Sequence, residues 1–166
     1  STEQAIKYCA FLKEWFEQHN IEVIRTGLQS TEELDSGNSL VAGPYEPAMG
    51  ELVVNEQYKQ RIERCIDEHL SSENVLGKQN DYNFSHFDCY HIHKVGCRFY
   101  SDSGDILMKH RIVISYPRSS TSKVRGLKNR NILYFQEMYP QFSIDWCEDN
   151  TRNTVRCCID GLQYML

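Results

Sequence analysis

Apolar residues recur at helical spacing through the first twenty positions of the chain. They make one wide stripe that consists of Ala5, Tyr8, Cys9, Phe11, Leu12, Trp15 and Phe16. Ser1 and Gln4 stand three residues apart, as in a capping box, in which each side chain satisfies a backbone N–H group of the first turn. The pattern predicts a helix that begins after Ser1 and ends at Asn20.

Alternating apolar and polar residues follow at residues 21–28, IEVIRTGL, and predict a strand. A second short strand is predicted at residues 40–42, before the two prolines of GPYEP bar further sheet pairing. Residues 51–55 fit either a strand or the first turn of a helix over residues 55–70. That helix is expected to be amphipathic, with an apolar face that collects Tyr58, Ile62, Cys65, Ile66 and Leu70.

The next part of the chain predicts a hairpin, in which residues 84–100 pair with residues 106–116 around a Ser-Gly turn. With a two-residue loop, His93 lies opposite Ile114 and His91 shares its face, so both imidazoles are expected to point into the protein. The opposite face is expected to meet solvent, and it carries Lys94, Arg98, Lys109 and Arg111.

A polar, basic loop is predicted over residues 117–130, and a short helix over residues 131–139. Residues 142–146 and 155–159 alternate again and predict a second hairpin. The chain is therefore predicted to form a single α+β domain over residues 1–166. Its antiparallel sheet, made of the two C-terminal hairpins and the N-terminal strands, is expected to pack against two amphipathic helices.

Composition favours a folded protein of the cytoplasm. Hydrophobic residues make up 40% of the chain and charged residues 25%, and no apolar run approaches the roughly 20 residues of a membrane-spanning helix. The N-terminal stretch carries charges and bulky aromatic residues where a signal peptide is apolar. The seven cysteines are an odd number and include adjacent Cys157 and Cys158, so we expect reduced, mostly buried thiols in an intracellular, reducing compartment.

Two histidines and two cysteines fall within residues 89–97, CYHIHKVGC. On a strand, His91 and His93 stand about 6.7 Å apart and can share one divalent metal ion, whereas Cys97 lies about 20 Å from His91. The His-Ile-His triplet resembles the His-hydrophobic-His motif of HUH endonucleases, metal-assisted enzymes that nick and join single-stranded DNA through a tyrosine. The resemblance implies a metal-dependent nuclease or phosphodiesterase that uses His91 and His93.

HUH endonucleases also carry a tyrosine on a helix, often followed four positions later by a lysine. Tyr58 and Tyr134 fall on predicted helices, but the fourth residue after each is Ile62 and Met138, respectively. The competing interpretation makes both histidines ordinary hydrogen-bonded residues of a partly buried sheet. A catalytic cysteine is a third possibility, which seven cysteines and six histidines leave open.

Charge is distributed unevenly along the chain. The net charge is −5, yet residues 106–136 contain seven basic and no acidic side chains. The 118–130 part of this segment is rich in hydroxyl donors, and Tyr100, Tyr116 and Tyr134 flank it as possible stacking platforms. Such a segment can hold phosphates or an acidic protein surface, unless the protein's own acidic helices neutralise it.

The first hypothesis is therefore a non-enzymatic intracellular binding protein, an inhibitor, adaptor or regulator, that engages a nucleic acid or an acidic protein surface and needs no cofactor. Its expected binding residues on the sheet face and the basic loop are Lys94, Arg98, Lys109, Arg111, Arg118, Lys123, Arg125, Lys128 and Arg130. The alternative is the metal-dependent nuclease, with a divalent ion on His91 and His93. The pattern leaves the oligomeric state open.

Overall fold

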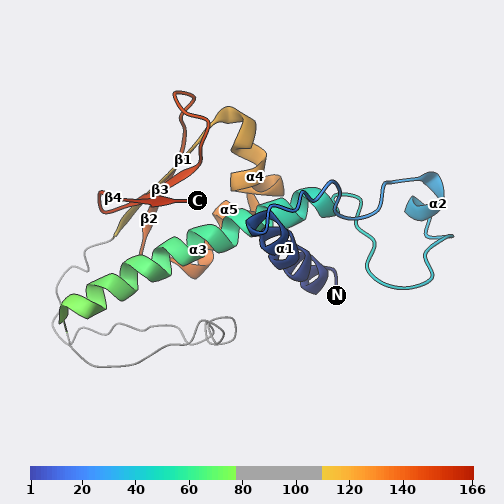
Figure 1. Cartoon of the computed structure of the whole chain (residues 1–166), viewed down its shortest axis with the longest axis horizontal. Coiled ribbons are helices and arrows are strands. Elements are labelled where there is room, and N and C mark those ends of the chain that lie inside the picture. Colours follow the sequence, from blue (N-terminus) through green and yellow to red (C-terminus); the bar gives the residue numbers. More distant parts are fainter. Residues whose placement is uncertain (78–109) are drawn as a thin grey trace.

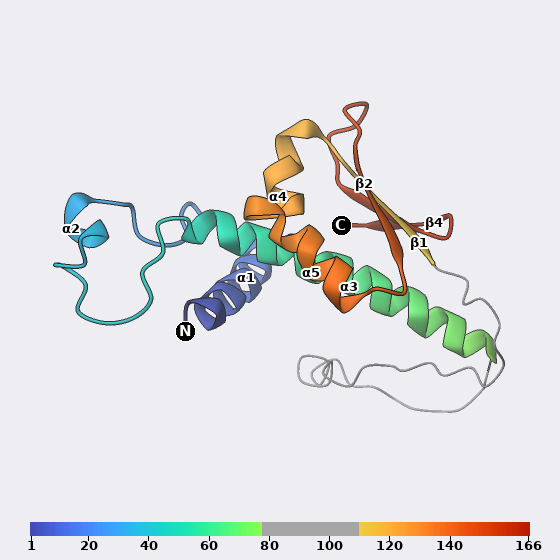
Figure 2. The same cartoon turned by 180° about the vertical axis from the view of Figure 1, so that it is seen from behind.

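The structure, a computed structural model, describes residues 1–77 and 110–166. The elements in chain order are α1 (Thr2–Gln18), α2 (Glu32–Asp35), α3 (Met49–Gly77), β1 (Arg111–Tyr116), η1 (Arg118–Ser120), α4 (Thr121–Arg125), η2 (Leu127–Asn129), α5 (Arg130–Met138), β2 (Ser143–Glu148), β3 (Arg156–Ile159) and β4 (Leu162–Met165). Helix α3 runs through the centre, with α1 across its first half and the sheet beside its second half (Figure 1). From behind, α4 and α5 lie over the middle of α3 (Figure 2). The α+β class is thus confirmed.

Helix α1 confirms the predicted N-terminal helix. The Ser1 hydroxyl accepts a hydrogen bond from the Gln4 amide at 3.3 Å, and the Gln4 side chain accepts one from the Ser1 amino group at 3.1 Å. The face that packs on α3 buries Ile6 and Ala10. Neither residue belongs to the predicted apolar stripe. Of that stripe, Ala5 and Cys9 pack against the contact, while Tyr8, Phe11, Leu12 and Trp15 are exposed, so the helix is confirmed but its contact face is not the predicted one.

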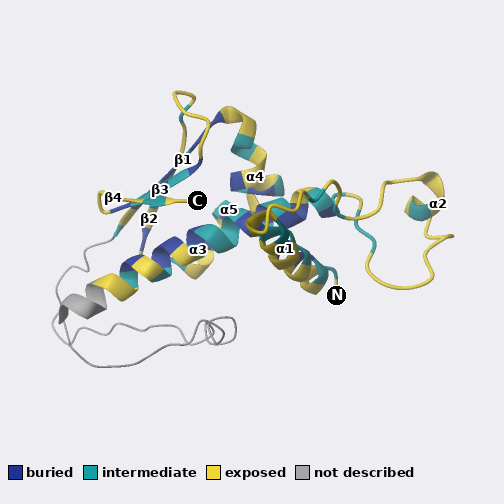
Figure 3. Cartoon of the chain, in the orientation of Figure 1, coloured by how far each residue is buried: buried dark blue, intermediate teal, exposed yellow. Residues whose placement is uncertain are grey.

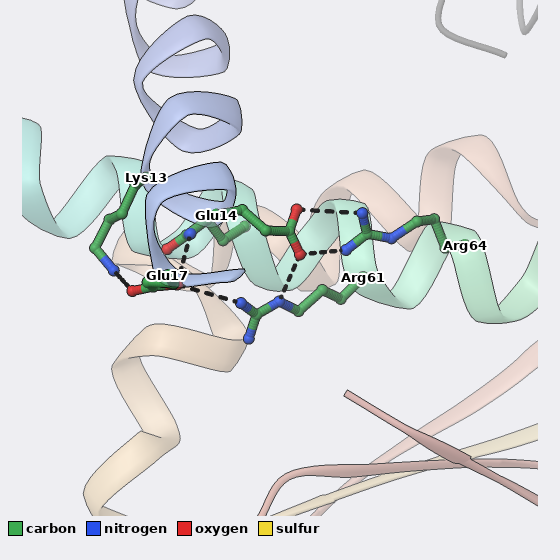
Figure 4. A network of polar contacts seen from close by, with 6 residues as sticks. Lys13, Glu14, Glu17, Arg61 and Arg64 are labelled. Carbon is green, nitrogen blue, oxygen red and sulfur yellow. Dashed lines mark hydrogen bonds and ion pairs between the residues drawn. The ribbon is translucent and has the colours of Figure 1, made fainter. Parts of the chain in front are cut away.

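An ion network also joins α1 to α3 (Figure 4). The Glu14 carboxylate accepts hydrogen bonds from Arg64 at 2.6 and 3.1 Å and from Arg61 Nε at 3.3 Å. On α1 itself, Lys13 pairs with Glu17 one turn later. The two helices are thus held by charge as well as by apolar contact.

Helix α3 starts at Met49, so the helical interpretation of residues 51–55 is confirmed. Ile62, Cys65 and Ile66 of its predicted apolar face are buried. The helix ends at Gly77, seven residues beyond the predicted end at residue 70.

The N-terminal strands predicted at residues 21–28 and 40–42 are wrong. Both segments are irregular and belong to an excursion of the chain that carries α2 (Figure 1). Alternation stabilises a strand only when one face is buried and a neighbouring backbone supplies hydrogen bonds. Here Ile24 is 91% exposed and Val41 fully exposed, so neither segment has a face to bury.

The sheet has the order β2-β1-β3-β4 and is mixed. Strand β1 runs parallel to β2 and antiparallel to β3, and β3 runs antiparallel to β4. The predicted purely antiparallel sheet is therefore wrong. Residues 142–146 and 155–159 do form strands, but not a hairpin with each other, because β1 lies between them.

Residues 84–109 of the first predicted hairpin lie outside the described residues. Its return strand forms β1, where the predicted alternation is confirmed, since Ile112, Ile114 and Tyr116 are buried. The predicted pairing of Ile114 with His93 is wrong, because Ile114 lies opposite Trp146 of β2 on one side and Cys157 of β3 on the other.

Two apolar clusters share α3, and the burial map shows them along its length (Figure 3). The larger cluster joins the second half of α3 to the sheet, α4 and α5, with Ile62, Ile66, Ile114 and Phe135 fully buried. The smaller one joins its first half to α1. Within the described ranges, no helix is long and apolar enough to cross a membrane.

Candidate functional site

The basic segment after β1 forms short helical turns in place of the predicted loop. Its backbone takes left-handed conformations at Gly126 (φ 79°), Lys128 (φ 53°) and Asn129 (φ 61°). At Gly126 a Cβ atom would stand 3.0 Å from the backbone nitrogen of Asn131. Glycine is needed there both for the conformation and for the close approach.

Two buried asparagines hold this segment against α3. The Asn55 amide donates to the carbonyl oxygens of Ser122 and Lys123, at 2.9 and 3.1 Å, and its oxygen accepts from the Leu127 amide at 2.8 Å. The Asn131 amide donates in turn to the Asn55 carbonyl oxygen at 2.9 Å. These bonds satisfy backbone groups that regular secondary structure leaves unpaired.

A hollow of about 450 Å³, here named the basic concavity, lies between these turns. It is lined by Arg118, Thr121, Ser122, Arg125, Gly126, Lys128 and Asn129. Three of the predicted binding residues therefore converge on one concave surface. Ser122 and Asn129 add a hydroxyl and a side-chain amide to the same lining, and such donors can bond phosphate oxygens beside the charged groups.

The other predicted binding residues do not line this hollow. Lys123 is exposed on α4, and Arg130 lines a separate hollow of about 170 Å³. Arg111 stands at the opposite end of β1, where its guanidinium donates to Asp145 of β2 at 2.9 and 3.1 Å. The remaining predicted positions lie outside the described residues, namely His91, His93, Lys94, Arg98 and Lys109.

Four of the five basic residues from 118 to 130 are exposed, whereas Arg125 is half-buried with its Nε shielded from solvent. Among residues 1–77 and 110–166, none of them forms a salt bridge with a carboxylate. The acidic group at the rim is Glu148, which accepts a hydrogen bond from the Thr121 hydroxyl at 2.9 Å. Neutralisation of the segment by the protein's acidic helices is thus not seen in this part of the chain.

Of the aromatic residues beside the segment, the two that the structure describes, Tyr116 and Tyr134, are not positioned to stack on bases. Tyr116 is 1% exposed, and burial raises the pKa of its hydroxyl, while the charge of nearby Arg125 partly opposes that rise. Tyr134 donates to Glu63 at 2.5 Å and has the Lys59 ammonium over its ring. Tyr100 lies outside the described residues.

A second polar cluster occupies the other end of β1. His69 of α3 and His110, which precedes β1, both face Asp160 in the turn between β3 and β4. His110 Nδ1 lies 2.6 Å and His69 Nε2 lies 3.3 Å from the same oxygen, Asp160 Oδ2. The other carboxylate oxygen accepts from the Arg111 amide at 2.8 Å.

Electrostatics keep Asp160 ionised. Burial raises the pKa of its carboxyl, but the hydrogen bonds from His110 and the Arg111 amide, with the nearby histidine rings, bring that pKa below its ordinary value. On the far side of His69, Nδ1 lies 3.0 Å from the Tyr164 hydroxyl. The cluster therefore offers two imidazoles and one carboxylate.

No motif in the sequence predicts this cluster, because its members are spread over α3, the start of β1 and the last hairpin. One local signal did exist. Asp160-Gly161 is a typical two-residue hairpin turn, and both residues have positive φ, 49° and 87°. That signal predicts β4 and places Asp160 at the sheet end.

Five cysteines lie in the described part of the chain, and all are free thiols. Cys65 of α3 and Cys157 of β3 are buried together, and a hydrogen bond from the Cys157 thiol lowers the pKa of Cys65 while raising that of Cys157. This contact lies inside the larger cluster, as the prediction of buried thiols expects for these two residues. Cys147 is exposed, and Cys89 and Cys97 lie outside the described residues.

Comparisons of the chain with models of protein families, with curated proteins and with solved structures found no match.

Proposed function

We propose that this chain is a binding protein that holds a phosphate-bearing partner, the backbone of a nucleic acid, in its basic concavity. The observation that carries the proposal is the convergence of Arg118, Arg125 and Lys128 on one hollow without a salt bridge to the described acidic residues. Guanidinium groups and hydroxyls match phosphate oxygens in geometry and charge.

The surroundings favour contact with the backbone over contact with bases. Base recognition by single-strand binders relies on exposed aromatic rings. Tyr116 is buried and Tyr134 is held by Glu63 and Lys59, so within the described part of the chain the concavity offers charge and hydrogen bonds without a flanking tyrosine. We therefore expect binding that varies little with sequence and weakens steeply with salt.

The test measures the fluorescence anisotropy of a labelled polyuridylate oligonucleotide over a series of salt concentrations. The variant Arg118→Glu/Lys128→Glu changes two exposed residues that line the concavity. We expect it to bind at least about tenfold more weakly. The slope of log K against log salt should shrink by about 1.4, since each phosphate contact of a single strand contributes roughly 0.7.

The matched control is Lys7→Glu/Arg25→Glu. It alters the net charge by the same amount at exposed positions that do not line the concavity. Equal losses in the two variants would show that binding follows overall charge, and the proposal would be wrong. A labelled polyglutamate peptide is run in parallel, and tighter binding of the peptide would point to an acidic protein partner and contradict the nucleic-acid proposal.

A further inference from the structure

Three metal-ligating side chains converge at the end of the sheet opposite the basic concavity. The ligand atoms of His69, His110 and Asp160 all lie within 4.8 Å of one another. They come from three elements far apart in the sequence, and His110 and Asp160 are separated by 50 residues. Of all the histidine, cysteine and carboxylate side chains that the structure describes, these three form the group whose ligand atoms lie close enough together to hold one metal ion.

The two distances from the histidine nitrogens to Asp160 Oδ2 are close to those of a filled site. Bonds of 2.0–2.1 Å around a tetrahedral zinc ion place ligand atoms about 3.3 Å apart. His69 Nε2 already lies 3.3 Å from Asp160 Oδ2. His110 Nδ1, at 2.6 Å from the same oxygen, needs to move away by about 0.7 Å, a small adjustment as a metal ion replaces the hydrogen bond.

Outer contacts already orient two of the three side chains. Tyr164 holds Nδ1 of His69 at 3.0 Å, which leaves Nε2 directed at the carboxylate. The Arg111 amide holds Oδ1 of Asp160 at 2.8 Å and leaves Oδ2 for the cluster. Metal-ligating histidines and carboxylates are typically fixed by such second contacts.

We propose that His69, His110 and Asp160 bind one divalent transition-metal ion, with zinc as the favoured metal. Two imidazole nitrogens and one carboxylate oxygen suit zinc, cobalt and ferrous iron better than magnesium or calcium. The His69 side chain is 4% exposed, whereas those of His110 and Asp160 are 28% and 36% exposed, so the cluster lies at the edge of the buried core. This site uses other residues than the predicted His91 and His93, and it goes beyond the proposed binding function.

The test titrates the metal-stripped full chain with Co²⁺, followed by displacement with Zn²⁺. We expect one Co²⁺ per chain, with the visible bands of nitrogen and oxygen ligands and without the intense near-ultraviolet band of a cobalt thiolate. Asp160→Asn and His110→Ala are each expected to weaken binding by more than about a hundredfold. Tyr164→Phe should bind the metal roughly tenfold more weakly, because it removes only an outer contact.

The variants are chosen to preserve the fold. Asparagine tolerates the left-handed backbone of residue 160 and can still accept the Arg111 amide. The control is His19→Ala, which removes an exposed histidine at the end of α1 and should leave metal affinity unchanged. In the unaltered chain, long-range ¹H–¹⁵N spectra should show Zn²⁺ shifting Nε2 of one histidine and Nδ1 of another, with the His19 ring unaffected.

Two results would overturn this metal site. One is a chain that binds no Co²⁺ at millimolar concentration. The other is unchanged stoichiometric binding in both Asp160→Asn and His110→Ala, which would place the metal on other histidines or on cysteines. Neither result bears on the oligonucleotide measurement, because the basic concavity shares no residue with this cluster.

Discussion

At the scale of single residues, Asn55 decides the shape of the basic concavity. Its side chain is 4% exposed and uses both of its polar atoms on the backbone of residues 122–127. No apolar residue can replace these bonds. The concavity thus depends on a neutral residue of α3 that does not line it.

Replacing Asn55 with alanine should lower the free energy of unfolding by at least about 2 kcal/mol, since three backbone groups of the segment lose their partner. Urea denaturation measures the loss. Oligonucleotide affinity should fall as well, because the turns that carry Arg125 and Lys128 lose their support. The control is Gln60→Ala on the same helix. The Gln60 side chain bonds to Glu56, one turn earlier, and to no other described residue. If Gln60→Ala lowered the free energy of unfolding as much as Asn55→Ala, the prediction would be contradicted.

Gly126 allows a second measurement at this scale. Gly126→Ala should destabilise the fold by about 3 kcal/mol. The alanine disfavours the positive φ of this position, and its methyl group would also press against Asn131. Gly161→Ala separates the two effects, since Gly161 has φ 87° and nothing within 4 Å of an added Cβ. It should cost about 1 kcal/mol. Equal thermal shifts in the two variants would show that the contact with Asn131 contributes nothing.

At the scale of elements, the contact between α1 and α3 depends on the charge of Glu14. Burial raises the pKa of its carboxyl, but the hydrogen bonds and charges of Arg64 and Arg61 outweigh burial, and the pKa falls below 4.5. An acid whose pKa is lowered by folding stabilises the fold above its unfolded pKa. That stability is lost as the pH falls through the folded pKa.

Glu14→Gln should therefore cost about 1 kcal/mol at neutral pH and close to nothing well below pH 4.5. Urea denaturation over a pH series measures the difference from the unaltered chain. Glu3→Gln is the control, because the Lys7–Glu3 pair on α1 is mostly exposed and should contribute less than about 0.5 kcal/mol. A pH-independent cost of Glu14→Gln would rule out the ion network as its source.

The elements themselves were predictable where local chemistry determines them. The capping box at Ser1, the apolar face around Ile62 and Ile66, and the alternation in β1 all gave correct elements. Strand partners were not predictable from alternation, which specifies the buried face and not the neighbouring strand. Ile114 has partners from β2 and β3, and neither adjoins β1 in the sequence.

For the candidate sites too, the sequence indicates some of the residues but not how the fold brings them together. The excess of basic residues was visible in the sequence, but their convergence depends on the left-handed turns at Gly126 and Lys128 and on the Asn55 bonds. The histidine cluster had no spacing motif, because His69 and Asp160 meet only through the packing of α3 against β3. A pattern search along the sequence cannot detect ligands that meet in this way.

At the scale of the whole molecule, α3 joins the two apolar clusters into one structure. It is 29 residues long, about 43 Å, and it contributes Leu52 and Val53 to one cluster and Ile62 and Ile66 to the other. An isolated helix is marginal in water, so each half of α3 relies on tertiary packing. We therefore expect the clusters to unfold together, in one cooperative transition.

The chain has two tryptophans, one on α1 and one against the larger cluster, so they report separately on these two parts. Trp15 lies on α1, and Trp146 packs against the larger cluster from β2. The variant Trp146→Phe retains only Trp15, and Trp15→Phe retains only Trp146. Urea unfolding followed by tryptophan fluorescence should give the same midpoint in both variants.

Adding Ile112→Ala, which truncates a fully buried side chain of the larger cluster on β1, away from the Glu14 contacts on α3, should lower both midpoints equally, for a loss of about 2–5 kcal/mol. The reason is that α1 has little to pack against once α3 unfolds, because its buried face meets Met49, Leu52 and Val53. If only the Trp146 transition moved, α1 and the first half of α3 would be an independent unit, and the coupling through the central helix would be disproved.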